Sequence, residues 1–274
     1  MNVSHAFRRS LLTLVLSVVA VSAVAQTTTK EFEPRSGQEG KDVVWVPTPD
    51  ALVEKMLDLS AVTPQDYVID LGSGDGRTVI AAAKRGARAH GIEYNQDMVE
   101  LSQRNAAAQG VSGKATFVKA DLFQSDFSKA TVITMFLMPW INERLRPVIL
   151  DLAPGTRIVS NAFDMGDWQA DETGTVPDCD QWCKALFWVV PAKVGGSWRL
   201  PQGELSLTQT YQMLSGTLAS GSRATPIGNG RLRGDRITFA VGGAQYTGRV
   251  TGDTIQGTVT SGGSTSDWQA SRNR

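Results

Sequence analysis

The sequence predicts an α/β protein in which a doubly wound, mostly parallel sheet over residues 42–191 precedes a small antiparallel β domain over residues 192–274. In the first region, short apolar segments alternate with helical patterns, which is typical of parallel strands joined by right-handed crossovers. Near Lys193 the helical periodicity disappears, and short alternating segments are broken by glycine. These two sequence patterns predict two domains of different architecture.

The first 41 residues are expected to contribute no folded element. Arg8 and Arg9 precede the apolar stretch 11–25, which ends in the small residues Ala-Val-Ala. This order indicates a signal peptide over residues 1–25, cleaved near Ala25, because the stretch is too short to span a bilayer. We therefore expect export to the periplasm. The secretory and twin-arginine routes, and a cytoplasmic pool, remain open alternatives. The polar residues 26–41 are expected to form a loose linker.

The elements of the sheet domain follow one another in a regular order. Thr48-Pro49 caps a first helix, since proline suits the first helical position. Strands are expected from Tyr67, up to Glu93, up to Asp121, over 130–136 and over 157–163, with helices over 78–84, 96–109 and 141–152 between them. Pro147 either kinks or restarts the last helix. A ligand would lie above the switch between the first and fourth strands.

The C-terminal domain contains a repeat at an offset of 18 residues. The segments G-R-L-R-G-D-R-I (230–237) and G-R-V-T-G-D-T-I (248–255) each carry a Gly-Asp pair suited to a two-residue hairpin turn. We expect an antiparallel meander of five to seven strands. Arg231, Arg233 and Arg236 would form its solvated face. The domain is a candidate module for an unidentified partner.

The most informative segment is D-L-G-S-G-D-G-R, residues 70–77. An apolar strand, a glycine-rich turn and a helix bring bare backbone against a nucleoside-type cofactor. The spacing G-x-G-x-G differs from the dinucleotide fingerprint. Asp70 would repel a pyrophosphate but attract a cation. S-adenosylmethionine has a sulfonium and an ammonium group and no phosphate, so the acid favours it over NAD.

Two further acids follow successive strands. Glu93 ends the second strand, where a carboxylate can accept hydrogen bonds from both hydroxyls of a ribose. Asp121 ends the third strand, where it or the adjacent backbone would meet the adenine amino group. Each acid alone is equally consistent with a solvated strand end, but a shared cofactor explains all three.

Four segments resemble the class I S-adenosylmethionine-dependent methyltransferases: V-P-T-P (46–49), D-L-G-S-G-D-G-R (70–77), G-I-E-Y-N (91–95) and A-D-L-F (120–123). Within this superfamily the chain looks closest to small bacterial relatives of the mitochondrial lysine methyltransferases that act on the ATP synthase c subunit. The resemblance runs from about Val44 to Pro191 and implies a Rossmann-like sheet. It also implies a set of cofactor-binding residues: Asp70, Gly72, Ser73, Gly74, Glu93 and Asp121.

No side chain stands out as a catalytic base. His5 lies in the leader, and His90 lies inside the second strand, where a packed core imidazole is expected. Methyl transfer from a sulfonium relies largely on positioning, so a strong base is not required. The loop L-M-P-W (137–140) lacks the polar first residue that methyltransferases acting on nucleic-acid bases or amides often carry, which counts against those substrates.

The acceptor pocket is expected to be aromatic. Trp45, Trp140 and Trp168, with Pro47, could wall a pocket for an alkyl amine or a hydrophobic small molecule, and ordinary packing is the alternative for each tryptophan. Asp164, just past the fifth strand, would receive a substrate ammonium group.

The two cysteines, Cys179 and Cys183, are the only ones in the chain. Two thiols cannot close a zinc site unaided, and C-x3-C is not the redox spacing C-x-x-C. A local disulfide fits an oxidising compartment, and free thiols are the alternative. No metal is expected.

The balance of acidic and basic side chains limits the classes of partner that we expect. The chain has 27 basic and 27 acidic side chains, and loss of residues 1–25 removes Arg8 and Arg9 but no acid, leaving a net charge of −2. Nucleic acid is not expected as a partner, because such proteins usually show a basic excess. No segment after the leader is expected to span a membrane.

Two functions remain open. The first is a methyltransferase that acts on a lysine-like amine, in a protein or a small molecule. The second is a non-catalytic exported protein with a relic methyltransferase fold and a partner-binding β domain.

Overall fold

The computed structural model describes residues 31–177 and 179–273. The expected signal peptide, residues 1–25, lies outside this part of the chain.

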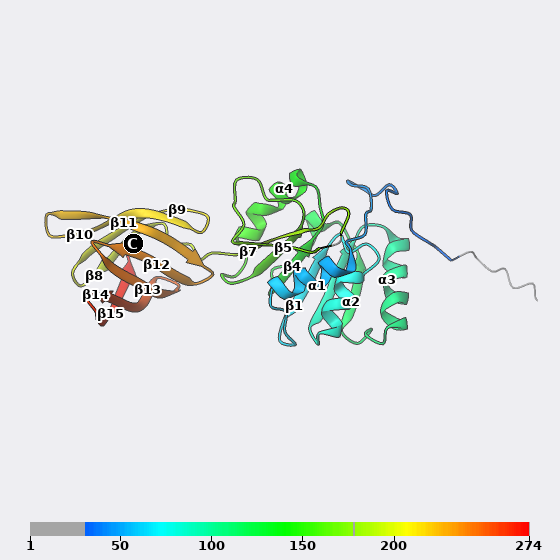
Figure 1. The fold of residues 1–274 in the computed structure, drawn as a ribbon, viewed down its shortest axis with the longest axis horizontal. Coiled ribbons are helices and arrows are strands. Elements are labelled where there is room, and N and C mark those ends of the chain that lie inside the picture. The colour runs from blue at the N-terminus through cyan, green and yellow to red at the C-terminus, as the bar shows by residue number, and fades with distance from the viewer. Residues whose placement is uncertain (1–30, 178, 274) are drawn as a thin grey trace, which may run out of the picture. The chain divides into compact units, whose positions relative to one another are not determined.

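A seven-stranded sheet has the order β3-β2-β1-β4-β5-β7-β6 (Figure 1). The first five strands in this order are parallel, and β7 pairs antiparallel with both β5 and β6. This arrangement confirms the doubly wound, mostly parallel sheet. The strands are β1 (Tyr67–Leu71), β2 (Arg88–Glu93), β3 (Ala115–Lys119), β4 (Val132–Met135), β5 (Arg157–Asn161), β6 (Glu172–Thr175) and β7 (Lys184–Val189).

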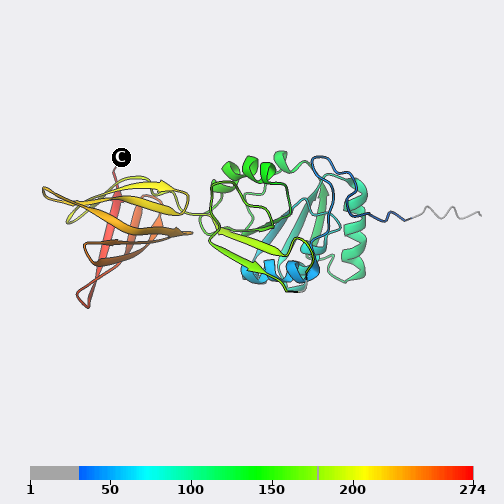
Figure 2. The same ribbon diagram turned by 45° about the horizontal axis from the view of Figure 1, so that its top comes forward.

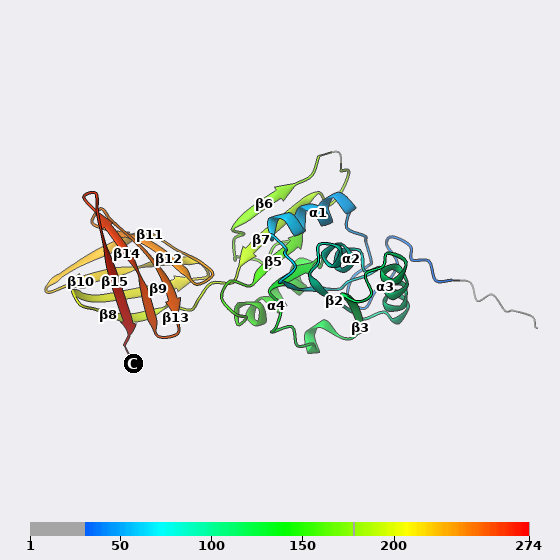
Figure 3. The same ribbon diagram turned by 90° about the horizontal axis from the view of Figure 1, so that it is seen from below.

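Helices cover both faces of the sheet (Figure 3). They are α1 (Asp50–Leu59), α2 (Arg77–Lys84), α3 (Gln96–Ala108) and α4 (Pro139–Leu150), with a short 3-10 turn η1 (Leu122–Gln124). Side chains of α2 and α3 pack in one apolar cluster with Val68, Ala89 and Val132 of the sheet. Side chains of α4 pack in another cluster with Ile69 and Ile133. Since neighbouring strand residues point to opposite faces, α4 covers the face opposite α2 and α3.

The strand order reverses between β1 and β4. The register places Asp70 beside Thr134 at the carboxyl ends of these two strands. Because the crossovers leave toward opposite faces, the ends of β1 and β4 border a crevice, as expected for this class of sheet. Pro147 lies inside α4, which continues through it as one helix.

Residues 35–47, here called the strap, are ordered rather than loose. Trp45 N–H donates to the Gln38 carbonyl over 2.9 Å, and Gly37 N–H donates to the Trp45 carbonyl over 2.7 Å. The expectation of a loose linker through residue 41 was therefore wrong for residues 35–41. Its composition is polar, but Trp45 and Lys41 tie the strap to partners far along the chain.

The C-terminal residues 196–272 form eight antiparallel strands that close into a barrel (Figure 2). The expectation of five to seven strands was too low, because β8 at the start of the domain pairs with β15 at its end. The turns at Gly234-Asp235 and Gly252-Asp253 connect hairpins as expected. The strands are β8 (Gly196–Leu200), β9 (Gly203–Thr210), β10 (Met213–Ser220), β11 (Arg223–Arg233), β12 (Arg236–Val241), β13 (Ala244–Thr251), β14 (Thr254–Ser261) and β15 (Ser264–Arg272).

The barrel core is filled by side chains, among them Trp198, Phe239 and Trp268. Arg231, Arg233 and Arg236 are all exposed, as expected for a solvated face, and two of them also form ion pairs: Arg231 contacts the Asp171 carboxylate over 2.6 Å, and Arg233 contacts Glu172 over 2.7 Å. Both acids belong to the sheet domain, which the sequence pattern of the barrel alone cannot indicate. Among the described residues, no helix has the length and apolar character required to cross a membrane.

Candidate active site

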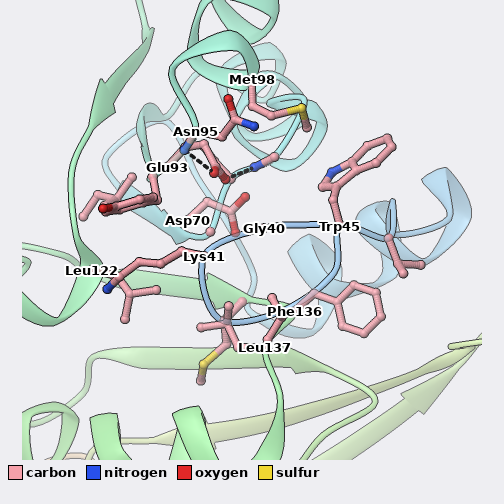
Figure 4. A pocket seen from close by; sticks show the side chains of 18 of the residues that line it. Gly40, Lys41, Trp45, Asp70, Glu93, Asn95, Met98, Leu122, Phe136 and Leu137 are labelled. Carbon is pink, nitrogen blue, oxygen red and sulfur yellow. Dashed lines mark hydrogen bonds between the residues drawn. The ribbon is translucent and has the colours of Figure 1, made fainter. Parts of the chain in front are cut away.

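A pocket of about 1040 Å³, including the part open to solvent, lies at the carboxyl ends of β1, β2 and β4. Its lining comes from the strap, the glycine-rich turn after β1, the end of β2 and the loop after β4. Figure 4 shows Asp70, Glu93 and Lys41 around this space, with the rings of Trp45 and Phe136 also bordering it. The pocket is therefore at the topological switch point, where the sequence predicts a ligand.

The turn after β1 requires glycine. Gly72 and Gly74 have φ values of +78° and +54°, which side-chain-bearing residues rarely adopt. A Cβ on Gly74 would lie 2.5 Å from the Trp45 Nε1 atom. Between them, the Ser73 hydroxyl is buried and has no hydrogen-bond partner among the described residues. The hydroxyl lies against Gly91 of β2, where a Cβ would come within 2.5 Å of its oxygen, so it is the bare backbone of the turn that the pocket wall offers to a polar ligand.

Asp70 is the buried acid of the pocket. Only 6 % of the residue is exposed, and the Thr134 hydroxyl donates a 2.6 Å hydrogen bond to its carboxylate. Burial raises the pKa of Asp70 to about 7, the Thr134 hydrogen bond opposes that rise, and the charges of Glu93 and Asp75 add to it. A cation bound beside this carboxylate would oppose the shift, because its charge favours the ionised form.

Glu93 fixes the edge of the turn. One carboxylate oxygen accepts from the Gly74 N–H and the other from the Asn95 N–H, both over 2.9 Å (Figure 4). Each oxygen retains a second lone pair, so the same carboxylate can also accept from two ribose hydroxyls. The carboxylate thus combines a structural role with the predicted binding role.

Asp121 caps the η1 turn rather than ending β3. Its carboxylate accepts from the Phe123 N–H over 2.9 Å and pairs with the Lys41 ammonium of the strap over 2.7 Å. The hydrogen bond from Lys41 lowers the pKa of Asp121, and the same bond raises the pKa of Lys41. Lys41 also lies 5.0 Å from the centre of the Tyr94 ring. Sequence reasoning missed Lys41, since nothing in its local sequence distinguishes it from other polar residues.

The residues expected to contact the acceptor are only partly brought together. Trp45 and Pro47 line the pocket. Trp140, at the start of α4, is 48 % exposed and lies outside the lining, and Asp164 is exposed after β5. Trp168 is fully buried, and its Nε1 donates to Gln212 of the barrel over 2.8 Å, so the alternative of ordinary packing holds for it.

His90 lies in β2 and outside the pocket lining, half buried rather than enclosed in the core. Its Nδ1 atom is 2.8 Å from the Thr116 hydroxyl. Burial lowers the pKa of His90, and the charge of Arg88 lowers it further. Cys179 and Cys183 form a disulfide in the loop between β6 and β7. Within the described part of the chain, no three His, Cys, Asp or Glu side chains gather as metal ligands would.

These features fit S-adenosylmethionine. Asp70 offers a negative charge to its cationic end, the turn of Gly72 and Gly74 offers bare backbone, and Glu93 retains acceptor capacity for a ribose. Within the described lining, no cluster of basic side chains awaits a pyrophosphate, since Lys41 and Arg77 are each paired with acids. The described lining, like Asp70 itself, therefore suits a cationic cofactor without phosphate groups.

The family model of the ANTKMT methyltransferase domain matches residues 70–172, and a DNA methylase model matches residues 28–104. A protein-lysine N-methyltransferase of Saccharolobus islandicus (strain REY15A) is 42% identical over 139 residues, covering 50% of this chain and 86% of that protein. A mouse lysine N-methyltransferase for the ATP synthase c subunit is 37% identical over 110 residues, and the match spans 39% of this chain and 43% of that protein.

Among solved structures, an RNA methyltransferase from Salinibacter ruber in complex with S-adenosyl-L-homocysteine is 42% identical, with a TM-score of 0.52. The match covers 54% of this chain and 96% of that one. Together with the lysine N-methyltransferase of which this chain covers 86%, this likeness confirms the resemblance seen in the four motifs. The chain belongs to the class I S-adenosylmethionine-dependent methyltransferases.

Proposed function

We propose that this methyltransferase transfers a methyl group to the side-chain amine of a protein lysine. The observation that carries the proposal is a pocket at the carboxyl ends of β1, β2 and β4, with the buried acid Asp70 in its wall, in a chain whose relatives include protein-lysine N-methyltransferases. The mouse relative is matched over less than half of its length, so its particular substrate, the ATP synthase c subunit, is not extended to this chain.

The chemistry asks little of the protein beyond positioning. When bound, S-adenosylmethionine supplies an electrophilic methyl group and a neutral thioether leaving group. The turn of Gly72 and Gly74, with Asp70 and Glu93, would hold it. The strap would exclude water from one side. The incoming lysine must be neutral to attack, so its ammonium proton is lost to solvent before methyl transfer.

A nucleic-acid acceptor is the second candidate, because the Salinibacter relative is described as an RNA methyltransferase. Two features of this chain speak against it. The acidic and basic side chains balance, whereas nucleic-acid binding favours a basic excess. The loop at residues 137–140 also lacks a polar residue at its start.

The test is to incubate the purified protein with radiolabelled S-adenosylmethionine and, in parallel, a lysine-rich protein, that protein with its amines blocked, total RNA and a small-molecule extract. Label is expected in the lysine-rich protein, and amine blocking should abolish it. Label in RNA alone would replace lysine by a nucleic-acid acceptor. Tight cofactor binding without transfer to any acceptor would favour the relic hypothesis for the fold.

We also propose export, supported by the basic pair Arg8-Arg9 and the apolar stretch that ends at Ala25. The native protein, recovered from a periplasmic fraction, should begin at Gln26 when its N-terminus is analysed by mass spectrometry. An intact Met1 in the cytoplasmic fraction, with no processed form, would reverse the proposed location.

A further inference from the structure

Three aromatic rings from three separate segments meet beside the pocket. Phe136 follows β4, Phe163 follows β5, and Trp182 lies in the loop between β6 and β7. The ring centres are 6.0 Å apart for Phe136 and Phe163, 5.7 Å for Phe136 and Trp182, and 5.3 Å for Phe163 and Trp182. We call these three side chains the aromatic wall.

The wall is continuous with the methyltransferase pocket. Phe136 lines that pocket, and Figure 4 shows its ring there, on the same side as Trp45. At the other end of the wall, Trp182 is 38 % exposed. An apolar core would bury such a ring, so the wall leads from solvent to the place where the cofactor binds.

Two of the rings are held by unusual backbone. Trp182 has a φ of +59°, and Ala162, next to Phe163, has a φ of +61°, although neither is glycine. Non-glycine residues with such a backbone cluster at functional sites. The buried Asn142 donates to the carbonyl oxygens of Phe163 and Asp164 and so fixes this segment from α4.

The loop that carries Trp182 is closed by the disulfide between Cys179 and Cys183. The bond constrains five consecutive residues and leaves Trp182 few alternative positions. Two acids neighbour the wall in the sequence, Asp164 beside Phe163 and Asp180 inside this loop, and both are exposed; the Asp164 carboxylate accepts from the Gly166 N–H over 3.2 Å. Aromatic faces and neighbouring carboxylates together attract an alkylammonium group rather than an anion.

We propose that the aromatic wall is the entry site for the acceptor lysine and that the disulfide positions Trp182 as its outer face. The wall would bind the methylene chain and the ammonium group of lysine before the amine reaches the cofactor. This inference rests on the lysine acceptor proposed above and adds its specificity-determining residues: Phe136, Phe163 and Trp182.

The test measures steady-state methylation of poly-L-lysine by the full chain and three variants, Trp182→Ala, Trp182→Leu and Trp182→Phe. The Ala and Leu variants should raise KM about 2- to 30-fold, the range that a cation–π contact is worth. Their kcat and their affinity for S-adenosylmethionine should not change. The Phe variant should stay within about two-fold of wild type, because it restores an aromatic face without the indole.

Reduction gives a second, independent readout. The chain has no other cysteine, so a reductant acts on this bond alone. Dithiothreitol should raise the KM of the wild type as Trp182→Ala does. The Cys179→Ser/Cys183→Ser variant should have the raised KM without reductant, and dithiothreitol should not change that KM further. Unchanged cofactor binding and an unchanged Tm would show that each protein is folded.

Three results would overturn the inference, and they are distinguishable. Equal KM values for wild type, Trp182→Ala and Trp182→Phe would show that the aromatic wall does not bind the acceptor, and the proposal of a lysine acceptor would still stand. An effect of Trp182→Ala without any effect of reduction would remove the role of the disulfide. A wild type that binds S-adenosylmethionine but never methylates poly-L-lysine would overturn the proposed function, and the wall with it.

Discussion

Asp70 is buried and lines the pocket where we expect the cationic end of the cofactor to bind. Its raised pKa of about 7 means that near neutral pH the carboxyl group is protonated in a substantial fraction of the ligand-free molecules. A cationic ligand binds the carboxylate form better, so binding at this pH must release part of a proton.

We therefore expect S-adenosylmethionine to bind more tightly as the pH rises from 6 to 7.5, with Kd falling up to about ten-fold per pH unit below the pKa. The interval from pH 6 to 7 carries the test, because the ligand's own amino group stays mostly protonated there; α-amino groups titrate at about 7.7–8.0. Calorimetry in two buffers of different ionisation enthalpy measures the released proton. Asp70→Asn should bind weakly and without this pH dependence; a Kd of wild type that stays constant from pH 6 to 7 would contradict the coupling.

Stability should respond in the opposite sense. Because the pKa of Asp70 is higher in the folded protein than its ordinary value of 3.8, the ligand-free protein should lose stability as the pH rises from about 4 to about 7 and change no further from this group above that. Thr134→Val removes the hydrogen bond that favours the carboxylate form of Asp70. The pH dependence of Kd and that of the free energy of unfolding should therefore both shift to higher pH. Thermal unfolding across this range measures the effect, with Asp70→Asn as the control that lacks it.

The sequence predicted the charge of the site better than its contacts. Asp70, Gly72, Gly74 and Glu93 lie within one strand-turn-helix unit and the next strand, so local spacing was sufficient to group them. The partners that set their chemistry come from afar: Thr134 is 64 residues from Asp70, and Lys41 is 80 residues from Asp121. Only the tertiary fold brings those pairs together, and no local pattern indicates them.

At the scale of elements, the strap is the part that sequence periodicity could not predict. It contains no helix and no regular strand, and its order depends on contacts that it makes across the pocket. Residues from Gln38 to Pro47 contribute about a third of the pocket lining, including Trp45 against Gly74 and Lys41 on Asp121. The strap is thus part of the pocket lining, and its role in cofactor binding is a prediction.

A chain that begins at Pro47 should remain folded but bind S-adenosylmethionine at least about ten-fold more weakly than one that begins at Glu33, because buried ligand surface and excluded water are lost with the strap. Pro47 and Thr48 are kept because Thr48 accepts hydrogen bonds from Arg77 and Asn161. Calorimetry compares the two chains, and circular dichroism shows whether each is folded. Equal affinities of the two chains for S-adenosylmethionine would show that the strap does not contribute to cofactor binding.

Element prediction succeeded where the pattern was local and failed at the edges. The five parallel strands were found because each contains a short apolar run, and β1, β2 and β4 are each followed by a helix. β6 was missed because E-T-G-T is short, polar and at the edge of the sheet. The closure of the barrel was missed because β8 and β15 pair across more than 70 residues, and no local sequence pattern in either strand indicates the pairing.

At the scale of the whole molecule, the relatives separate the catalytic domain from the barrel. The Salinibacter structure has 96% of its length within a match that covers 54% of this chain, and the ANTKMT model lies within residues 70–172. A class I methyltransferase therefore exists as a solved protein without a counterpart of the barrel. The barrel nevertheless contacts the sheet domain through buried polar groups, since Trp168 donates to Gln212 and Asp171 pairs with Arg231.

A chain that ends at residue 191 should therefore bind S-adenosylmethionine within about two-fold of the full chain but unfold at a lower temperature. Truncation leaves the Trp168 Nε1–H without Gln212 and removes the Asp171–Arg231 ion pair, although Asp171 still accepts from the Val189 N–H. An unsatisfied buried polar group costs about 1–3 kcal/mol, which corresponds to a Tm lower by about 2–12 °C. Gln212→Leu in the full chain should reproduce the Trp168 part of that loss with no effect on cofactor affinity. A truncated chain that keeps the circular dichroism of a folded α/β domain but no longer binds the cofactor would contradict this separation and give the barrel a part in the active site.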